Sequence, residues 1–250
     1  GDEEKKLVNE VLDSGIISGF AASADKAFLG GKFVTQLESL FCQKMNSKFA
    51  ISVNSATSGL HASLIAANVG PGDEVIVSPY SMSASAAAVM MCHAVPVFVD
   101  IEKDTFCLNP DLIESSITPR TKAIIPVNLF GQSADFEKII HISKKYNLIV
   151  IEDNAQAAGS KYKEKFAGTL GDMGVFSLNR HKNIQCGEGG IVLTNDSKLA
   201  YRLQLARNHG EVVGFLKGNN INEDIVGYNY RLTELQAAVA IGQLNRLEEI

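Results

Sequence analysis

Short apolar segments alternate with helix-like segments along most of the chain. The apolar runs are continuous and include FAISV, EVIVS, VPVFVD, TKAIIPV and LIVIED. Continuous apolar runs are typical of strands that are buried on both faces of a parallel sheet. The segments between them, such as residues 33–46 and 133–146, carry apolar residues at helical spacing. This alternation, with short links, predicts an α/β fold with a mostly parallel, doubly wound sheet that is flanked by helices.

Polar residues that directly follow these strands are the first candidates for a ligand site. In an open α/β sheet, ligands bind outside the carboxyl ends of the strands. The candidate positions are 54–58, 78–81, 128, 153–156 and 177–182.

The composition argues against several classes of protein. With 46% apolar residues and a net charge of −5, the chain of 250 residues has neither a basic tract for nucleic acid nor a basic membrane surface. Its four cysteines are far apart and form no CxxC pair, so we expect reduced thiols in a cytoplasmic protein and no metal site. The first 15 residues are typical of a charged amphipathic helix, not of a signal peptide. No apolar run approaches the roughly 20 residues that span a bilayer.

Lys182 follows a predicted strand at residues 174–178 and precedes the glycine-rich turn GEGG. Backbone can approach a ligand closely beside glycine. A lysine amine forms Schiff bases with carbonyl compounds, including pyridoxal 5′-phosphate (PLP). Because a lone lysine beside glycines is usually an exposed loop residue, the assignment of Lys182 depends on the rest of the chain.

Two further stretches offer groups that a phosphorylated cofactor needs. The strand at residues 49–53 breaks into NSATSG before a predicted helix, so Thr57 and Ser58 lie where a helix N-terminus stabilises an anion. On its own this signal is weak, because Ser and Thr are also the ordinary residues that cap a helix N-terminus. Asp153, at the end of LIVIED, could hold the pyridinium nitrogen of PLP protonated, so that the ring acts as an electron sink, or could cap the next helix.

The remaining segments carry weaker signals. Residues 15–32 are rich in Gly, Ala and Ser, and could close over a site, lie in an interface or form a mobile loop. A polar loop with the acidic pair Glu223 and Asp224 precedes the segment VGYNYRLT. Residues 233–250 have a strong helical pattern without a terminating Gly or Pro, so we expect the chain to be a fragment of a longer protein.

Eight segments point together to one family. They occur in the order NSATSGLH, PGDEVIVSPYS, PVFVDIEKDTF, ITPRTKAIIPVNLFGQ, IEDNAQAAG, GTLGDMGVFSLNRHKNIQCGEGG, RNHG and GYNYRLTELQAA. The sequence closely resembles the DegT/DnrJ/EryC1/StrS family of PLP-dependent sugar aminotransferases, which have the aspartate aminotransferase fold type. The resemblance covers nearly the whole chain. Its most specific motif is FS, four residues, Lys, four residues, GEGG.

The resemblance implies catalytic roles for residues of this chain. Lys182 matches the lysine that binds PLP and transfers the proton during transamination. Asp153 matches the aspartate that pairs with the pyridine nitrogen, and Gln156 matches the glutamine near the ring hydroxyl.

The resemblance also implies further cofactor contacts. Thr57, Ser58 and Ser177 match phosphate ligands, and Tyr80 matches the aromatic residue that stacks on the ring. Asn229 matches an asparagine that reaches the phosphate from the neighbouring subunit, so a homodimer with shared active sites is implied.

Three positions depart from the family pattern or complicate it. Ala56 stands where glycine is common, and Asn154 follows the aspartate where a small residue is usual. In some relatives a histidine replaces the lysine, and the enzyme dehydrates the sugar. Counting five residues on from Ser177 gives Lys182 and not His181, which could contact the substrate or point outward.

The implied enzyme is a PLP-dependent aminotransferase. It would move an amino group from an amino acid, by family analogy glutamate, to a keto sugar that is nucleotide-linked, for cell-surface polysaccharide or secondary-metabolite sugar biosynthesis. The alternatives are a PLP-dependent sugar dehydratase of the same family, against which Lys182 argues, and a non-catalytic PLP-binding or sugar-binding homologue. The expected domains are a PLP-binding large domain with an N-terminal helical arm (1–232) and a helix (233–250) leading toward a C-terminal small domain that is largely absent from this chain.

Overall fold

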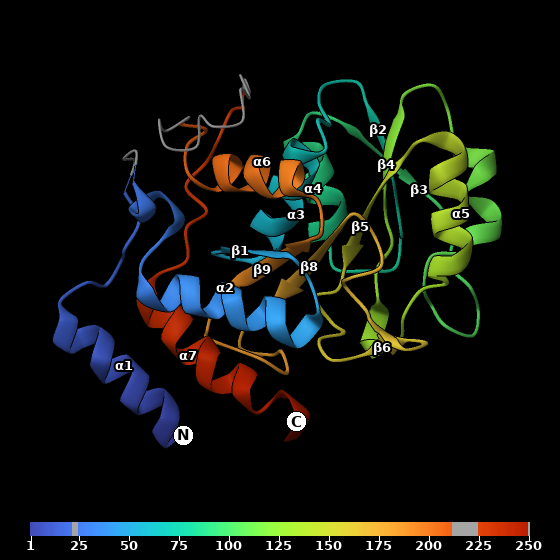
Figure 1. Cartoon of the computed structure of the whole chain (residues 1–250). Helices are drawn as coiled ribbons and strands as arrows, with labels where there is room; N and C mark the ends of the chain where they lie inside the picture. Colours follow the sequence, from blue (N-terminus) through green and yellow to red (C-terminus); the bar gives the residue numbers. More distant parts are fainter. Residues whose placement is uncertain (22–24, 212–224, 250) are drawn as a thin grey trace.

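The computed structural model describes residues 1–21, 25–211 and 225–249, so Glu223 and Asp224 lie outside the described residues. A seven-stranded sheet forms its centre, with the spatial order β1-β9-β8-β5-β4-β2-β3 (Figure 1). The strands are β1 (Phe49–Val53), β2 (Glu74–Val77), β3 (Val95–Phe98), β4 (Thr121–Ile125), β5 (Ile149–Asp153), β8 (Met173–Ser177) and β9 (Gly190–Thr194). Neighbouring strands pair in parallel, except that β9 is antiparallel to β1 and β8. The predicted, mostly parallel sheet is confirmed.

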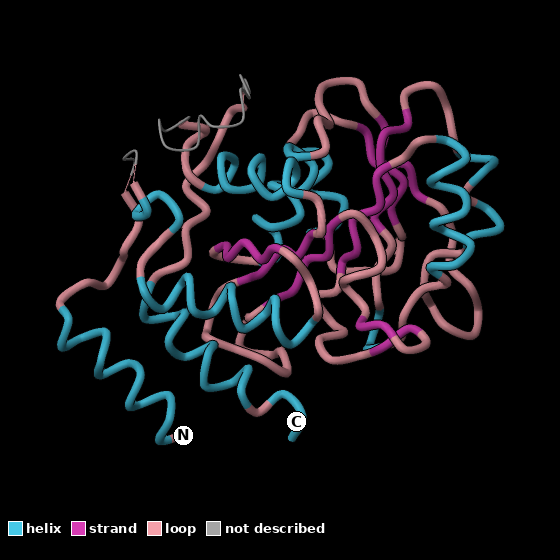
Figure 2. The backbone as a smooth tube through the Cα atoms, in the orientation of Figure 1, coloured by secondary structure: helices cyan, strands magenta, loops and turns pink. Residues whose placement is uncertain are grey.

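Helices cover both faces of this sheet (Figures 1 and 2). One face packs against α3 (Ala56–Ala66), α4 (Ala84–Met91) and α6 (Ser197–Arg207). The other face packs against α2 (Lys32–Met45) and α7 (Glu234–Asn245) at one end and α5 (Phe136–Tyr146) at the other. The first helix, α1 (Asp2–Ser14), packs along α7. The doubly wound arrangement follows from these two helical layers.

The strands can serve both layers because successive side chains point to opposite faces. In β4, Ala123 and Ile125 join the core under α3, α4 and α6, whereas Ile124 joins the core under α5. In β9, Val192 and Ile191 divide in the same way between the two faces. Continuous apolar runs are therefore required, as the sequence indicated.

Short elements complete the described chain. They are the 3₁₀ helices η1 (Lys26–Leu29), η2 (Pro110–Leu112), η3 (Glu114–Ser116), η4 (Leu129–Gly131) and η6 (Leu247–Glu249), and a hairpin of β6 (Lys161–Tyr162) and β7 (Lys165–Phe166). Residues 109–117 form no longer helix than η2 and η3. The hydroxyls of Ser115 and Ser116 bond back to the carbonyl of Leu112, and Pro119 disfavours a helical conformation just before it.

Two buried charged side chains, Arg207 and Glu234, tie distant elements together. Arg207, at the end of α6, is fully buried and lies 2.7 Å from Glu38 of α2. Glu234, at the start of α7, accepts the backbone N–H groups of Gly31 at 3.1 Å and Phe33 at 2.7 Å, where α2 begins. The backbone N–H of Glu234 also donates to the carbonyl of Ile17. The described part of the Gly/Ala/Ser-rich segment is thus attached to α7.

Within the described ranges, no helix is both long enough and apolar enough to cross a lipid bilayer.

Candidate active site

A pocket of about 400 Å³ lies at the edge of the sheet where β1, β5 and β8 end and β9 begins. The residues that line it come from five segments of the chain: Ser55, Ala56, Thr57 and Leu60, which follow β1; Ser81, Met82 and Ala84, which follow β2; Asp153, Ala155 and Gln156, at and beyond the end of β5; Ser177, Asn179, His181 and Lys182, at and beyond the end of β8; and Glu188 and Gly189, which precede β9. This is the edge at which the open α/β sheet was expected to bind its ligand.

The structure brings most of the predicted site residues together. Lys182, Asp153, Gln156, Thr57 and Ser177 all line this pocket. They come from three separate segments of the chain, which are 20 or more residues apart in the sequence. Their individual roles stay predictions.

Ser58, Tyr80 and Asn229 are not among the lining residues of the pocket. The Ser58 hydroxyl donates to Asn54 Oδ1 at 2.6 Å, and its backbone N–H donates to Ser55 Oγ at 3.1 Å. These bonds place Ser58 in the cap of α3, which begins four residues earlier than the predicted helix at residue 60.

Tyr80 lies among other aromatic side chains. It is 49% exposed, and its ring centroid is 5.9 Å from that of Phe106 and 6.3 Å from that of Phe130. Met82, two residues later, does line the pocket. Asn229 is exposed, and its backbone carbonyl accepts a bond from the side chain of Asn54.

Asp153 is buried at the end of β5, and its carboxylate has two hydrogen bonds. Oδ2 accepts the Ser85 hydroxyl at 2.7 Å, and Oδ1 accepts the backbone N–H of Ala155 at 3.3 Å. Burial raises the pKa of Asp153, whereas the bonds from Ser85 and Ala155 and the charge of Lys182 oppose that rise. The side chain is therefore an acid whose ionised form gains from a cationic partner in the pocket.

Lys182 lies in a turn that is stabilised by hydrogen bonds between backbone groups of the turn. The N–H of Lys182 donates to the carbonyl of Asn179 at 2.9 Å, and the N–H of Arg180 donates to Gly187 at 3.0 Å. Gly187 has φ +87°, a conformation that glycine adopts without strain. Ile184 is fully buried in the core and anchors the turn. The backbone beneath the amine is therefore fixed.

His181 lines the pocket beside Lys182, although its side chain is exposed. Arg180 Nε donates to His181 Nε2 at 3.2 Å. The structure thus places His181 at the mouth of the pocket.

The first turn of α3 forms one wall of the pocket. Ser55 caps it, and the first residues of a helix present free backbone N–H groups and the positive end of the helix dipole. Gly190 of β9 lies directly against this turn, because a Cβ atom there would stand 2.8 Å from the backbone nitrogen of Ala56. The site can hold an anion at this wall.

A buried polar network holds the loop beyond Asp153, and sequence reasoning missed it. The Glu152 carboxylate accepts backbone N–H groups of Gly168 and Gly171, both at 2.6 Å, and of Leu170. Burial outweighs these bonds and raises the pKa of Glu152 to about 7. Asn154 is also buried, and its side chain bonds the carbonyls of Ala157 and Ala167. The departure at position 154 therefore has a structural reason.

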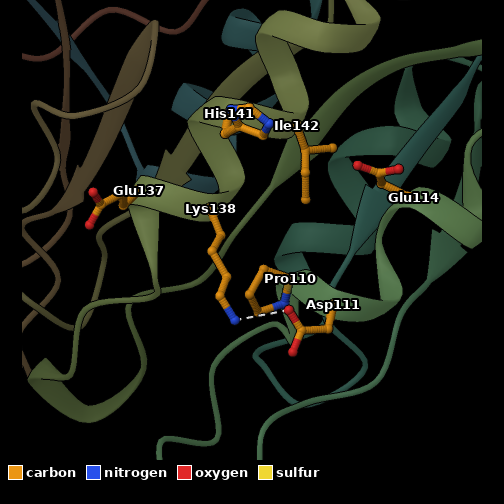
Figure 3. A pocket seen from close by; sticks show the side chains of 7 residues that line it. All are labelled: Pro110, Asp111, Glu114, Glu137, Lys138, His141 and Ile142. Atoms are coloured by element: carbon orange, nitrogen blue, oxygen red, sulfur yellow. Dashed lines mark hydrogen bonds and ion pairs between the residues drawn. The ribbon is translucent and has the colours of Figure 1, made fainter.

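A larger hollow of about 610 Å³ lies between α5 and the helices η2 and η3 (Figure 3). It shares no lining residue with the first pocket. In this hollow, Lys138 Nζ lies 2.9 Å from Asp111 Oδ1, so these two charges are paired with each other. Across the described residues, no three His, Cys, Asp or Glu side chains are grouped so that they could hold a metal ion.

Comparisons with known proteins place the chain in a family. The family described as the DegT/DnrJ/EryC1/StrS aminotransferase family matches residues 2–250. The chain belongs to this family.

Three similar proteins illustrate how closely the chain matches members of this family and solved structures. GDP-perosamine synthase of Caulobacter vibrioides is 43% identical over 246 residues, which cover 98% of this chain and 62% of that protein. The structure of an aminotransferase from Psychrobacter cryohalolentis has a TM-score of 0.88 and 33% identity, over 98% of this chain and 62% of that one. A GDP-4-keto-6-deoxymannose-3-dehydratase structure with a trapped PLP-glutamate geminal diamine has a TM-score of 0.85 and 30% identity, over 99% of this chain and 66% of that one. The chain therefore spans about three fifths of the curated relative, and the predicted fold class is confirmed.

Proposed function

We propose that this protein is a PLP-dependent aminotransferase that moves an amino group from glutamate to a nucleotide-linked keto sugar, for polysaccharide or secondary-metabolite sugar biosynthesis. The observation that carries the proposal is that Lys182 and Asp153 line the same pocket, close enough for the lysine charge to act on the carboxylate. The family and the GDP-sugar enzymes named above support it.

The residues of the pocket fit PLP. Asp153 is a buried carboxylate that gains from a cationic partner, as a pyridinium nitrogen would be. Thr57 and Ser177 offer hydroxyls beside the first turn of α3, where a phosphate would meet free backbone N–H groups. Gln156 lines the same pocket and would lie near the ring hydroxyl. When bound, PLP withdraws electrons from the carbon that bears the amino group.

Lys182 would have two tasks. Its Nζ would attach the cofactor, and once an amino substrate has replaced it there, the same atom would carry the proton taken from the substrate Cα. The fixed turn beneath Lys182 limits the positions that the amine can reach, which favours proton transfer between defined atoms. Asp153 would stay ionised throughout and would hold the ring nitrogen protonated. His181, at the mouth of the pocket, would contact the sugar nucleotide.

We also propose a cytoplasmic homodimer with shared active sites. Asn229 is exposed and absent from the pocket of its own chain, as expected for a residue that serves the partner's site. The four cysteines are free thiols, which suits a reducing compartment.

The dehydratase is the second candidate, because a solved dehydratase shares the fold at 30% identity. Lys182 argues against it, since the resemblance links dehydration to a histidine at that position.

One incubation separates the candidates. The protein would receive PLP, ¹⁵N-labelled glutamate and GDP-4-keto-6-deoxymannose, and the sugar product would be analysed by mass spectrometry. An aminotransferase transfers the label to the sugar and releases 2-oxoglutarate. A sugar that loses water without gaining nitrogen identifies a dehydratase, and an unchanged sugar with bound PLP favours the non-catalytic homologue.

A further inference from the structure

A chain of hydroxyl groups connects the pocket to the buried carboxylate of Asp153. Ser81 lines the pocket, and its Oγ lies 3.1 Å from Oγ of Ser85. The Ser85 hydroxyl then donates to Asp153 Oδ2 at 2.7 Å. Ser85 is 1% exposed and Asp153 is 4% exposed. The last bond joins the first turn of α4 to the end of β5, 68 positions away in the sequence.

The protons of this chain have one consistent direction. An ionised carboxylate can only accept hydrogen bonds, so Ser85 must donate its single hydroxyl proton to Asp153. The Ser85 oxygen is then free to accept the hydroxyl proton of Ser81. A serine inside a helix often bonds a carbonyl in the preceding turn, whereas Ser85 directs its hydroxyl at a carboxylate from another element.

The hydrogen bond from Ser85 is the shorter of the two hydrogen bonds that the Asp153 carboxylate accepts. The other oxygen has the longer bond of 3.3 Å from the N–H of Ala155. A hydrogen bond to the charged form favours ionisation, and such bonds are stronger than those between neutral groups. Among the described residues, the titratable side chains that line the same pocket besides Asp153 are Lys182, His181 and Glu188. Of these, Lys182 acts on Asp153, in the same direction as Ser85.

We propose that Ser85 is a positioning residue, which keeps the Asp153 carboxylate ionised and in one orientation toward the cofactor nitrogen, and that Ser81 supports it from the pocket. This inference rests on the proposed function, because it gives the ionised carboxylate a cationic partner in the bound cofactor.

The test measures Asp153 directly, first without cofactor. Aspartate side chains would be labelled with ¹³C at Cγ, the Asp153 signal would be assigned with Asp153→Asn, and its titration would be followed by NMR. In Ser85→Ala the midpoint should rise by about one to two pH units, the equivalent of a hydrogen bond to a charged group. Ser85→Thr keeps the hydroxyl and should restore the wild-type midpoint.

Ser63→Ala is the matched control. Ser63 is also fully buried, but its hydroxyl bonds the carbonyl of Gly59 within α3. Removing the Ser63 hydroxyl tests general packing effects, and the midpoint of the Asp153 titration should not change.

A second measurement extends the test to the cofactor. The dissociation constant of PLP would be followed against pH by absorbance, since affinity should fall when Asp153 becomes protonated. In Ser85→Ala this fall should move to higher pH by a similar amount, and Ser85→Thr should reverse the shift. If all variants bind PLP with the same pH profile and the same Asp153 midpoint, the inference is wrong while the proposed function stands. If the wild type does not bind PLP, both are overturned.

Discussion

Two adjacent carboxylates on β5 have different surroundings. Side chains of successive strand residues point to opposite faces, so Glu152 and Asp153 diverge although both are buried. Glu152 meets the backbone N–H groups of the loop at residues 168–171, whereas Asp153 meets Ser85 and the pocket. Glu152 therefore holds the loop, and Asp153 is left for the ligand.

The residue scale gives a prediction about pH. Burial raises the pKa of Glu152 from 4.5 to about 7, so the folded protein holds this proton more tightly than the unfolded chain. The stability that this proton contributes is fully present below about pH 4.5 and is lost as the pH rises through about 7. Glu152→Gln should destabilise the protein by about 1–3 kcal/mol at pH 5, because its amide group cannot accept all the backbone N–H bonds. That difference should shrink toward pH 7.

Urea unfolding of wild type and Glu152→Gln at pH 5, 6 and 7 measures this trend. Glu114→Gln is the control, because Lys145 lowers the pKa of Glu114 and this residue stays ionised across the same range. A Glu152→Gln difference that stays constant or grows with pH would show that Glu152 is already ionised in the folded protein at pH 5.

At the scale of elements, the site depends on how closely β9 approaches the first turn of α3. A Cβ at position 190 would stand 2.8 Å from backbone atoms of Ser55 and Ala56, closer than such atoms normally come. Gly190→Ala must therefore displace the N-terminus of α3, and should cost about 1–3 kcal/mol of unfolding free energy. Because the same turn is the proposed phosphate site, PLP affinity should also fall, by about tenfold or more.

Thermal unfolding and a PLP titration would check both effects. Gly70→Ala is the matched control, since a Cβ there meets open space, and its effect on unfolding should stay within about 0.5 kcal/mol. If Gly190→Ala loses stability but keeps wild-type affinity, the phosphate does not lie at α3.

At the scale of the whole molecule, the sequence predicted what local patterns determine. Continuous apolar runs predicted the mostly parallel sheet. The polar positions after its strands predicted the edge of the sheet at which Lys182 and Asp153 line one pocket. The residue pairs Ser85–Asp153 and Arg207–Glu38 were not predicted, because each joins side chains far apart in the sequence. Ser85 lies in an Ala/Ser-rich stretch without any local signal of its partner.

Local sequence patterns did not predict some elements correctly, and they leave some roles untested. The hairpin of β6 and β7 has only two residues in each strand, which is too short for a periodic signal. The start of α3 was placed too late, because its first turn consists of small residues that are equally common in loops. The domain boundary at residue 232 and the role of Asn229 stay predictions.

The most direct test of the central claim is the absorbance of the protein with PLP, before and after glutamate, compared with Lys182→Ala. The control is Lys161→Ala, a lysine of β6 that packs on the Phe166 ring and does not line the pocket. We expect wild type and Lys161→Ala to show a visible band that glutamate abolishes, and Lys182→Ala to show none. If Lys182→Ala keeps the same glutamate-sensitive band, Lys182 does not attach the cofactor and the account is wrong.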